Sequence, residues 1–191
     1  MRHLQAARGT TLTTTPPEPV SPARRRRLLA IFAGLALAGW TLDLVTKNLA
    51  LQRLDGHPDV PLIGDLLTLT LVRNPGAAFS LGTEATVFLS MLAIAAVLFI
   101  LWWSRKLGSL WWAVALGFLL AGISGNLTDR LFRDPSPMRG HVVDMLMLPN
   151  WPVFNLADVF INTGGIMVVI AVFRGVEIDG SRAEKREEEP A

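Results

Sequence analysis

Four long apolar runs constrain the fold of this chain more than any other feature. They cover residues 28–50, 85–103, 107–127 and 153–173. The last three contain no charged residue except Asp158, and the first is uncharged up to Asp43. A helix needs about 20 apolar residues to cross the hydrocarbon core of a bilayer. We therefore predict a mainly α membrane protein with four transmembrane helices, which agrees with the hydrophobic content of 51% over 191 residues.

The two ends of the chain differ in composition from this membrane part. Residues 1–27 include a stretch rich in Thr, Pro and Arg that cannot build a hydrophobic core, and we predict a disordered cytoplasmic tail there. Residues 174–191 finish in RAEKREEEPA and are predicted to form a charged, solvated tail. The membrane domain is then expected at residues 28–173.

The four arginines before the first run also allow a second interpretation. Basic residues followed by an apolar run are typical of a signal peptide, and Ala-Leu-Ala at 36–38 is a candidate cleavage site. The apolar segment continues beyond that site, however, and cleavage would leave Asp43 and Lys47 at the mature N-terminus. A first transmembrane helix is therefore the favoured interpretation.

The distribution of Lys and Arg predicts the orientation in the membrane. If both termini are cytoplasmic, the tails and the turn between the second and third helices hold twelve of the 18 basic residues. These are Arg2, Arg8, Arg24–Arg27, Arg105, Lys106, Arg174, Arg182, Lys185 and Arg186. Cytoplasmic segments carry the excess of positive charge in membrane proteins. We therefore expect both termini in the cytoplasm.

With this topology, the costly polar residues of the first, third and fourth helices fall near the outer surface. They are Asp43, Lys47, Asn126, Asp129, Arg130, Asn155 and Asp158, with Asp144 in the outer loop before the fourth helix. Asp43 and Lys47 are four residues apart and share a helix face. A carboxylate inside a membrane helix is costly and marks a functional site by default, which applies to Asp158. The convergence indicates one polar site at the outer leaflet.

Each of these residues also has a purely structural interpretation. Asp43 and Lys47 suit an ion pair on a helix surface, and Asp129 and Arg130 suit interfacial anchors. Asn155 suits a helix cap or an interhelical hydrogen bond. Asp144 alone would be an ordinary loop carboxylate, and Asn162, one turn beyond Asp158, is expected to make a helix–helix contact.

The outer segment after the first helix predicts a small β structure. Two short apolar strands lie within residues 60–72 on either side of Gly64-Asp65, a pair typical of a two-residue hairpin turn. Asn74-Pro75-Gly76 then ends the second strand. We expect this hairpin to flank the site, although a plain connecting loop is the alternative.

The available side chains limit the chemistry of the site. The chain has no cysteine, and it has neither a Ser/His/Asp set at the outer face nor a zinc-binding motif. Asp144 and Asp158 remain, fourteen residues apart. Two carboxylates in contact share one proton, so one can act as general base on water and the other as general acid. This predicts an aspartic-protease mechanism if the intervening loop folds back.

Five motifs in chain order resemble those of the lipoprotein signal peptidase family, also called signal peptidase II. They are DLVTK (43–47), RNPGAAFS (73–80), GISGNLTDR (122–130), VVDM (142–145) and FNLAD (154–158). The resemblance implies a bacterial inner-membrane aspartyl endopeptidase that cuts prolipoproteins before a diacylglyceryl-modified lipobox cysteine, in the outer leaflet. It also implies a sheet cradle with a short outer helix over the membrane surface, and it implies no metal or other cofactor.

The same resemblance implies roles for individual residues. Asp144 and Asp158 match the catalytic dyad. Positions that support the site or contact substrate are matched by Asp43, Lys47, Asn74, Asn126, Asp129, Arg130 and Asn155. The expected partners are the diacylglyceryl-prolipoprotein and membrane lipids, with no nucleic acid and with a monomeric protein. The chain departs from the family at Met145, where Phe is usual, and at Val159, where Ser is usual.

Two other function classes remain as alternatives at this stage. A small ion or solute transporter could use Asp158 as a proton relay, but it would need polar residues across the whole bilayer. The inner half of the fourth helix is apolar, which argues against this hypothesis. A membrane scaffold without activity would make both aspartates dispensable.

Overall fold

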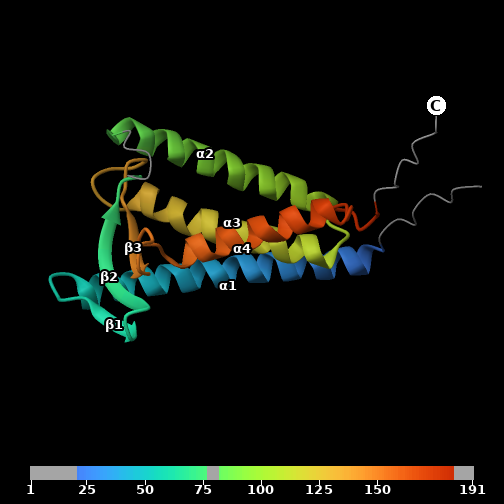
Figure 1. The fold of residues 1–191 in the computed structure, drawn as a ribbon. Helices are drawn as coiled ribbons and strands as arrows, with labels where there is room; N and C mark the ends of the chain where they lie inside the picture. Colours follow the sequence, from blue (N-terminus) through green and yellow to red (C-terminus); the bar gives the residue numbers. More distant parts are fainter. Residues whose placement is uncertain (1–20, 77–81, 183–191) are drawn as a thin grey trace, which may run out of the picture.

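The computed structural model describes residues 21–76 and 82–182, and these form four long helices and a small sheet (Figure 1). The elements are α1 (Pro22–Leu54), β1 (Val60–Ile63), β2 (Leu67–Asn74), α2 (Gly82–Trp103), the 3₁₀ turn η2 (Ser104–Lys106), α3 (Leu110–Phe132), β3 (Val142–Met147) and α4 (Leu156–Phe173). The four α-helices are long and apolar enough to cross a membrane. The predicted fold class, four spans with a small sheet, is confirmed.

Helix α1 begins earlier than the sequence predicted. The side chain of Ser21 accepts a hydrogen bond from the backbone of Arg24, and Pro22 occupies the start of the helix, where its missing N–H costs nothing. Residues 22–27 are therefore helical and exposed, and the predicted boundary at residue 28 is wrong. The rest of the predicted tail, residues 1–20, lies outside the described residues.

Helix α3 is the centre of the bundle and packs against the other three helices. Small residues let its neighbours approach closely. A Cβ added at Gly122, for example, would lie only 2.3 Å from the carbonyl oxygen of Ala157 in α4. Helix α2 lies along one side of the bundle and packs mainly against α3 (Figure 1).

The sheet lies at the end of the bundle opposite the start of α1 and the end of α4 (Figure 1). We call these the sheet end and the termini end. The strands are antiparallel in the order β1-β2-β3. The predicted hairpin is present, but its turn covers residues 64–66 rather than two residues, and Leu66 N donates to Ile63 O at 2.9 Å. Strand β2 ends at Asn74, as predicted.

Strand β3 was not predicted from the sequence, which placed Asp144 in a loop. Successive side chains of a strand point to opposite faces. Val143 and Met145 pack with Ala50 and Leu54 of α1, so Asp144 is on the other face of the strand. Met145, which stands where the family usually has Phe, is therefore a core residue on the face away from Asp144.

The chain after β3 folds back, as the predicted mechanism required for the loop between Asp144 and Asp158. Leu146 and Phe154 form an antiparallel bridge in which Phe154 N donates to Leu146 O at 2.9 Å, and Leu146 N donates to Phe154 O at 2.8 Å. This closed loop brings the start of α4 beside β3. The short outer helix implied by the resemblance is not among the described elements, and residues 77–81 lie outside them.

The segment after α4 is not a solvated tail over residues 174–182. Ile178 is buried, and its carbonyl accepts hydrogen bonds from the backbone of Gly108 and Ser109. Trp112 Nε1 donates to Val176 O at 2.7 Å. The segment therefore closes the termini end of the bundle, and only residues 183–191 of the predicted tail lie outside the described residues.

Candidate functional site

Asp144 is presented by β3, and amide groups from two other elements bind it. Asn74, the last residue of β2, donates from Nδ2 to Asp144 Oδ2 at 2.9 Å. Asn155 donates from Nδ2 to Asp144 Oδ1 at 2.6 Å. Asp144 is almost fully buried, so these two donors replace the water that a carboxylate would otherwise need.

Asp158 lies in the first turn of α4 and completes a capping box with Asn155. Asp158 N donates to Asn155 Oδ1 at 3.0 Å, and Asn155 N donates to Asp158 Oδ2 at 3.1 Å. A carboxylate near a helix N-terminus also interacts favourably with the helix dipole. The predicted cost of a carboxylate inside the membrane helix is therefore reduced, because Asp158 occupies the helix entrance.

The two carboxylates are linked through one residue. Asn155 contacts Asp144 with its side chain and Asp158 with its backbone, and it is fully buried. Both structural alternatives for Asn155, a helix cap and an interhelical hydrogen bond, are present together, because Asn155 Nδ2 also donates to Asn126 Oδ1 of α3 at 3.1 Å. Burial raises the pKa of Asp144 to about 6, and the charge of the nearby Asp158 adds to the rise. Hydrogen bonds from Asn74 and Asn155 act in the opposite direction.

A fully buried cluster of charged side chains is connected to Asp158 through Asn126. Lys47 Nζ lies 2.8 Å from Asp43 Oδ2 and 2.9 Å from Asp129 Oδ2, and it donates to Asn126 Oδ1 at 2.9 Å. Asn126 in turn donates from Nδ2 to Asp158 Oδ1 at 2.8 Å. Lys47 therefore determines which end of the Asn126 amide faces Asp158. The ion pair of Asp43 and Lys47 that the sequence suggested is present, but both side chains are inside the bundle rather than on a helix surface.

Asp43 and Asp129 also bind backbone amides of the elements that carry the dyad. Asp43 Oδ1 accepts from Ala157 N in α4 at 2.9 Å, and Asp129 Oδ2 accepts from Val143 N in β3 at 3.1 Å. The close approach of Asp43 requires Gly125, where a Cβ would lie 2.4 Å from Asp43 Oδ2. Asp129 is fully buried, so its interpretation as an interfacial anchor is wrong.

Arg130 lies beside this network without joining its hydrogen bonds. A Cβ at Gly76 would be 3.9 Å from Arg130 Nη1. That nitrogen is buried and has no hydrogen-bond partner among the described residues. Arg130 and Asn126 also line a groove of about 230 Å³ between α2, α3 and α4, whose other walls are apolar side chains such as Leu92 and Ile161.

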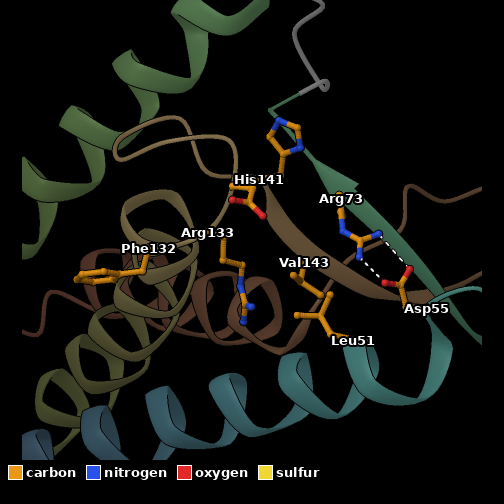
Figure 2. Close-up of a pocket in the computed structure, with 8 residues that line it drawn as sticks. Leu51, Asp55, Arg73, Phe132, Arg133, His141 and Val143 are labelled. Atoms are coloured by element: carbon orange, nitrogen blue, oxygen red, sulfur yellow. Dashed lines mark hydrogen bonds and ion pairs between the residues drawn. The ribbon is translucent and has the colours of Figure 1, made fainter.

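A second cavity, of about 420 Å³, lies on the face of the sheet opposite to Asp144 (Figure 2). Arg73 and Val143 line it, and both alternate along their strands with residues of the Asp144 face. The ion pair of Arg73 and Asp55 crosses its wall at 2.8 Å, and His141 is beside it (Figure 2). This cavity is therefore separate from the two carboxylates.

Arg133 was not predicted as a site residue, and the contact predicted for Asn162 differs from the one observed. Arg133 Nε pairs with buried Asp129, and Arg133 Nη2 donates to Asn48 Oδ1 at 3.1 Å. The four-residue spacing from Asp129 was the available signal. Asn162 is exposed and donates to the carbonyl of Asp158 in its own helix, so the predicted helix–helix contact is wrong.

Comparison with known proteins identifies similar sequences over most of the chain. A family model described as signal peptidase (SPase) II matches residues 35–174. A lipoprotein signal peptidase of Mycobacterium avium is 48% identical over 158 residues, which are 83% of this chain and 85% of the relative. A lipoprotein signal peptidase of Rhodococcus jostii is 47% identical over 169 residues, 88% of this chain and 83% of the relative.

Two solved structures of bacterial membrane enzymes share the fold. One has a TM-score of 0.63 at 25% identity and covers 81% of this chain and 92% of its own. The other has a TM-score of 0.66 at 27% identity and covers 73% of this chain and 90% of its own. The four helices and the sheet are thus arranged as in known membrane enzymes.

Proposed function

The chain belongs to the signal peptidase II family, and on this premise we propose that Asp144 and Asp158 are the catalytic dyad with which it cuts prolipoproteins before a diacylglyceryl-modified lipobox cysteine. Membership makes the chain a bacterial aspartic-type peptidase that removes signal peptides from prolipoproteins. The position of the cut and the two catalytic carboxylates are what the proposal adds.

The observation that carries this proposal is the placement of two carboxylates on either side of Asn155. Asp158 accepts amide hydrogen bonds from Asn126 and Asn155, which hold its carboxylate in a fixed orientation. Asp144, whose pKa burial raises to about 6, is the partner that holds the proton. An ionised and a protonated carboxyl at one site are the two groups that peptide hydrolysis by this mechanism requires.

In the proposed reaction, ionised Asp158 removes a proton from a water molecule as the water attacks the scissile carbonyl. Protonated Asp144 donates its proton to the carbonyl oxygen, which forms the tetrahedral intermediate. Collapse of the intermediate breaks the C–N bond. Asp158 gives the proton that it took from water to the leaving amine, and Asp144 takes a proton from a hydroxyl of the diol, which restores both carboxyl groups. The buried cluster of Asp43, Lys47 and Asp129 keeps Asn126 oriented during these steps.

The groove between α2, α3 and α4 is the proposed binding site for the lipid-modified part of the substrate. Its apolar walls suit acyl chains, and Arg130 Nη1 supplies a buried donor without a partner among the described residues. Such a donor costs free energy until it is paired. A carbonyl oxygen of the substrate backbone or of the glyceryl ester would pair with it.

The proposed orientation puts the dyad at the outer leaflet of the cytoplasmic membrane. The start of α1, the turn η2 and the end of α4 are at the termini end (Figure 1), and they carry the exposed basic residues Arg25, Arg105, Lys106 and Arg174. This supports a cytoplasmic location for both termini. The sheet and both aspartates are at the other end. A monomeric state, contacts with membrane lipids, and independence from metal and nucleic acid remain predictions.

The transporter hypothesis receives no support from the packing. At the termini end the core is formed by apolar side chains, among them Phe32, Trp112 and Leu116. The linked polar residues are confined to the sheet end, so the described part of the chain offers no polar path across the bilayer. Membership in a peptidase family argues against an inactive scaffold.

The proposed cleavage can be tested with the purified chain and a synthetic prolipoprotein in two forms, with and without the diacylglyceryl group. Mass spectrometry of the products should show a cut directly before the modified cysteine and little cleavage of the unmodified peptide. Equal cleavage of both forms, or a cut at another bond, would contradict the proposed substrate.

A further inference from the structure

Helix α2 carries two buried hydroxyl groups that the proposed mechanism does not use. Thr86 and Ser90 are one turn apart and almost fully buried, although most of α2 is apolar and much of it is exposed. Buried hydroxyls in a membrane helix need partners. The hydrogen-bond partners of Thr86 and Ser90 therefore show which segments this end of α2 contacts.

Both hydroxyls reach carbonyl groups outside the helix. Thr86 Oγ1 donates to Pro75 O at 2.5 Å. Ser90 Oγ lies 2.8 Å from Met138 O and 2.8 Å from Thr86 O of its own helix, and its single proton is shared between them. We call Thr86 and Ser90, with the carbonyls of Pro75 and Met138, the α2 clasp.

The clasp joins α2 to the segment that follows β2 and to the segment that precedes β3. Pro75 directly follows Asn74, whose side chain donates to Asp144. Met138 belongs to the segment between α3 and β3, where Gly140 N donates to Arg130 O. Met138 has a φ of 69°, a conformation that non-glycine residues adopt only when the surroundings hold them there.

The clasp also determines how α2 closes over the groove that holds Arg130. Leu89 and Leu92 of α2 form one wall, and Arg130 and Ile161 are on the other walls. Because α2 packs mainly against α3 among the described elements, two hydrogen bonds at its sheet end restrict its sideways position. The width of the groove beside Arg130 follows from that position.

We propose that Thr86 and Ser90 are positioning residues that set the width of this groove and thereby the selectivity of the enzyme for the acyl chains of its substrate. The inference rests on the proposed function, since it takes the groove as the acyl-chain site. A long acyl chain buries more apolar surface against the walls of a narrow groove than a short acyl chain does. Loosening the clasp therefore weakens the binding of long chains most.

The test compares kcat and KM for long-chain and short-chain diacylglyceryl substrates in Thr86→Val and Ser90→Ala. We expect KM for the long-chain substrate to rise about fivefold in each variant, with kcat changed by less than about twofold. The preference for the long chain should fall by about the same factor. Ser90→Thr keeps the hydroxyl and should retain the preference.

Thr46→Val is the matched control, because the Thr46 hydroxyl donates only to carbonyls of its own helix, Leu42 O and Asp43 O. An unchanged preference in both clasp variants, or an equal loss in Thr46→Val, would overturn the inference. Asp144→Asn is measured alongside. If it is inactive while the clasp variants keep the preference, only the clasp inference fails; if it cleaves normally, the proposed function itself fails.

Discussion

The Asn155 side-chain amide donates to Asp144 Oδ1 at 2.6 Å, across the loop that connects β3 with α4. The same residue caps α4 and binds Asp158 through its backbone. One asparagine thus couples the start of a membrane helix to both carboxylates. Stability and activity can be separated at this position, because the cap needs an acceptor whereas the contact with Asp144 needs a donor.

Asn155→Ser should separate these two roles. Serine keeps an oxygen that caps the helix, so the unfolding midpoint in detergent should stay close to that of the wild type. It lacks the amide that donates to Asp144 and to Asn126 Oδ1, and we expect kcat to fall at least about tenfold. Asn155→Ala should lose both and unfold with about 1 kcal/mol less stability. Wild-type kcat in Asn155→Ser would contradict this account.

Lys47→Met should destabilise the protein strongly, because it leaves two buried carboxylates short of a cation. Removing one partner of a buried ion pair costs about 3–5 kcal/mol. The second change in Lys47→Met/Asp43→Asn should restore part of the loss, measured by chemical unfolding in detergent.

The control for Lys47 is Arg73→Met, which breaks an ion pair with Asp55 whose side chains are 50% and 56% exposed. A surface pair of this kind contributes about 0–1 kcal/mol. Similar losses in Lys47→Met and Arg73→Met would show that the buried cluster does not have the proposed role.

The dependence of activity on pH should report the proton on Asp144. The pKa of Asp144 is raised to about 6 by burial and by Asp158, and the protonated form is the proposed acid. The value of kcat/KM should therefore fall as the pH rises above about 6, with an apparent pKa that belongs to the coupled pair.

Asn74→Ala should move this fall to higher pH. The Asn74 amide stabilises the ionised form of Asp144, so its removal raises the pKa further. Asn48→Ala is the control, since Asn48 accepts a hydrogen bond from Arg133 rather than contacting the dyad. A shift of the Asn74→Ala profile to lower pH would be the contrary result.

Trp112→Phe should loosen the segment after α4 without affecting cleavage. The change removes the hydrogen bond to Val176 O but keeps an aromatic ring next to Trp103. Hydrogen exchange of the backbone around Ile178 should become faster, while kcat/KM stays within about twofold because the dyad is at the other end of the bundle. Unchanged exchange would mean that the bond does not hold this segment.

Much of the fold could be predicted from the sequence, because a bilayer imposes a simple requirement on length and polarity. The four apolar runs led directly to α1, α2, α3 and α4, and Asn74-Pro75-Gly76 marked the end of β2. Strand β3 was missed because Asp144 interrupts a short apolar segment. Its pairing with β2 depends on contacts between distant residues that no local pattern reveals.

The residues of the site could be identified from the sequence, but the ion pairs and hydrogen bonds that connect them could not. Asp43 and Lys47 shared a helix face, yet the pattern did not indicate that Lys47 also reaches Asp129 and Asn126 of α3. That contact depends on how closely α1 and α3 approach at Gly125. The prediction for residues 174–182 was wrong for the same reason, since Ile178 is buried by residues far away in sequence.

The central claim is that Asp144 and Asp158 together perform the hydrolysis. The most direct measurement is the rate of cleavage of a diacylglyceryl-modified prolipoprotein by Asp144→Asn and Asp158→Asn, with Asp65→Asn in the exposed hairpin turn as the matched control. Both dyad variants should insert into the membrane and unfold as the control does, but their cleavage should fall to the background rate. Cleavage at the wild-type rate by either dyad variant would contradict the account.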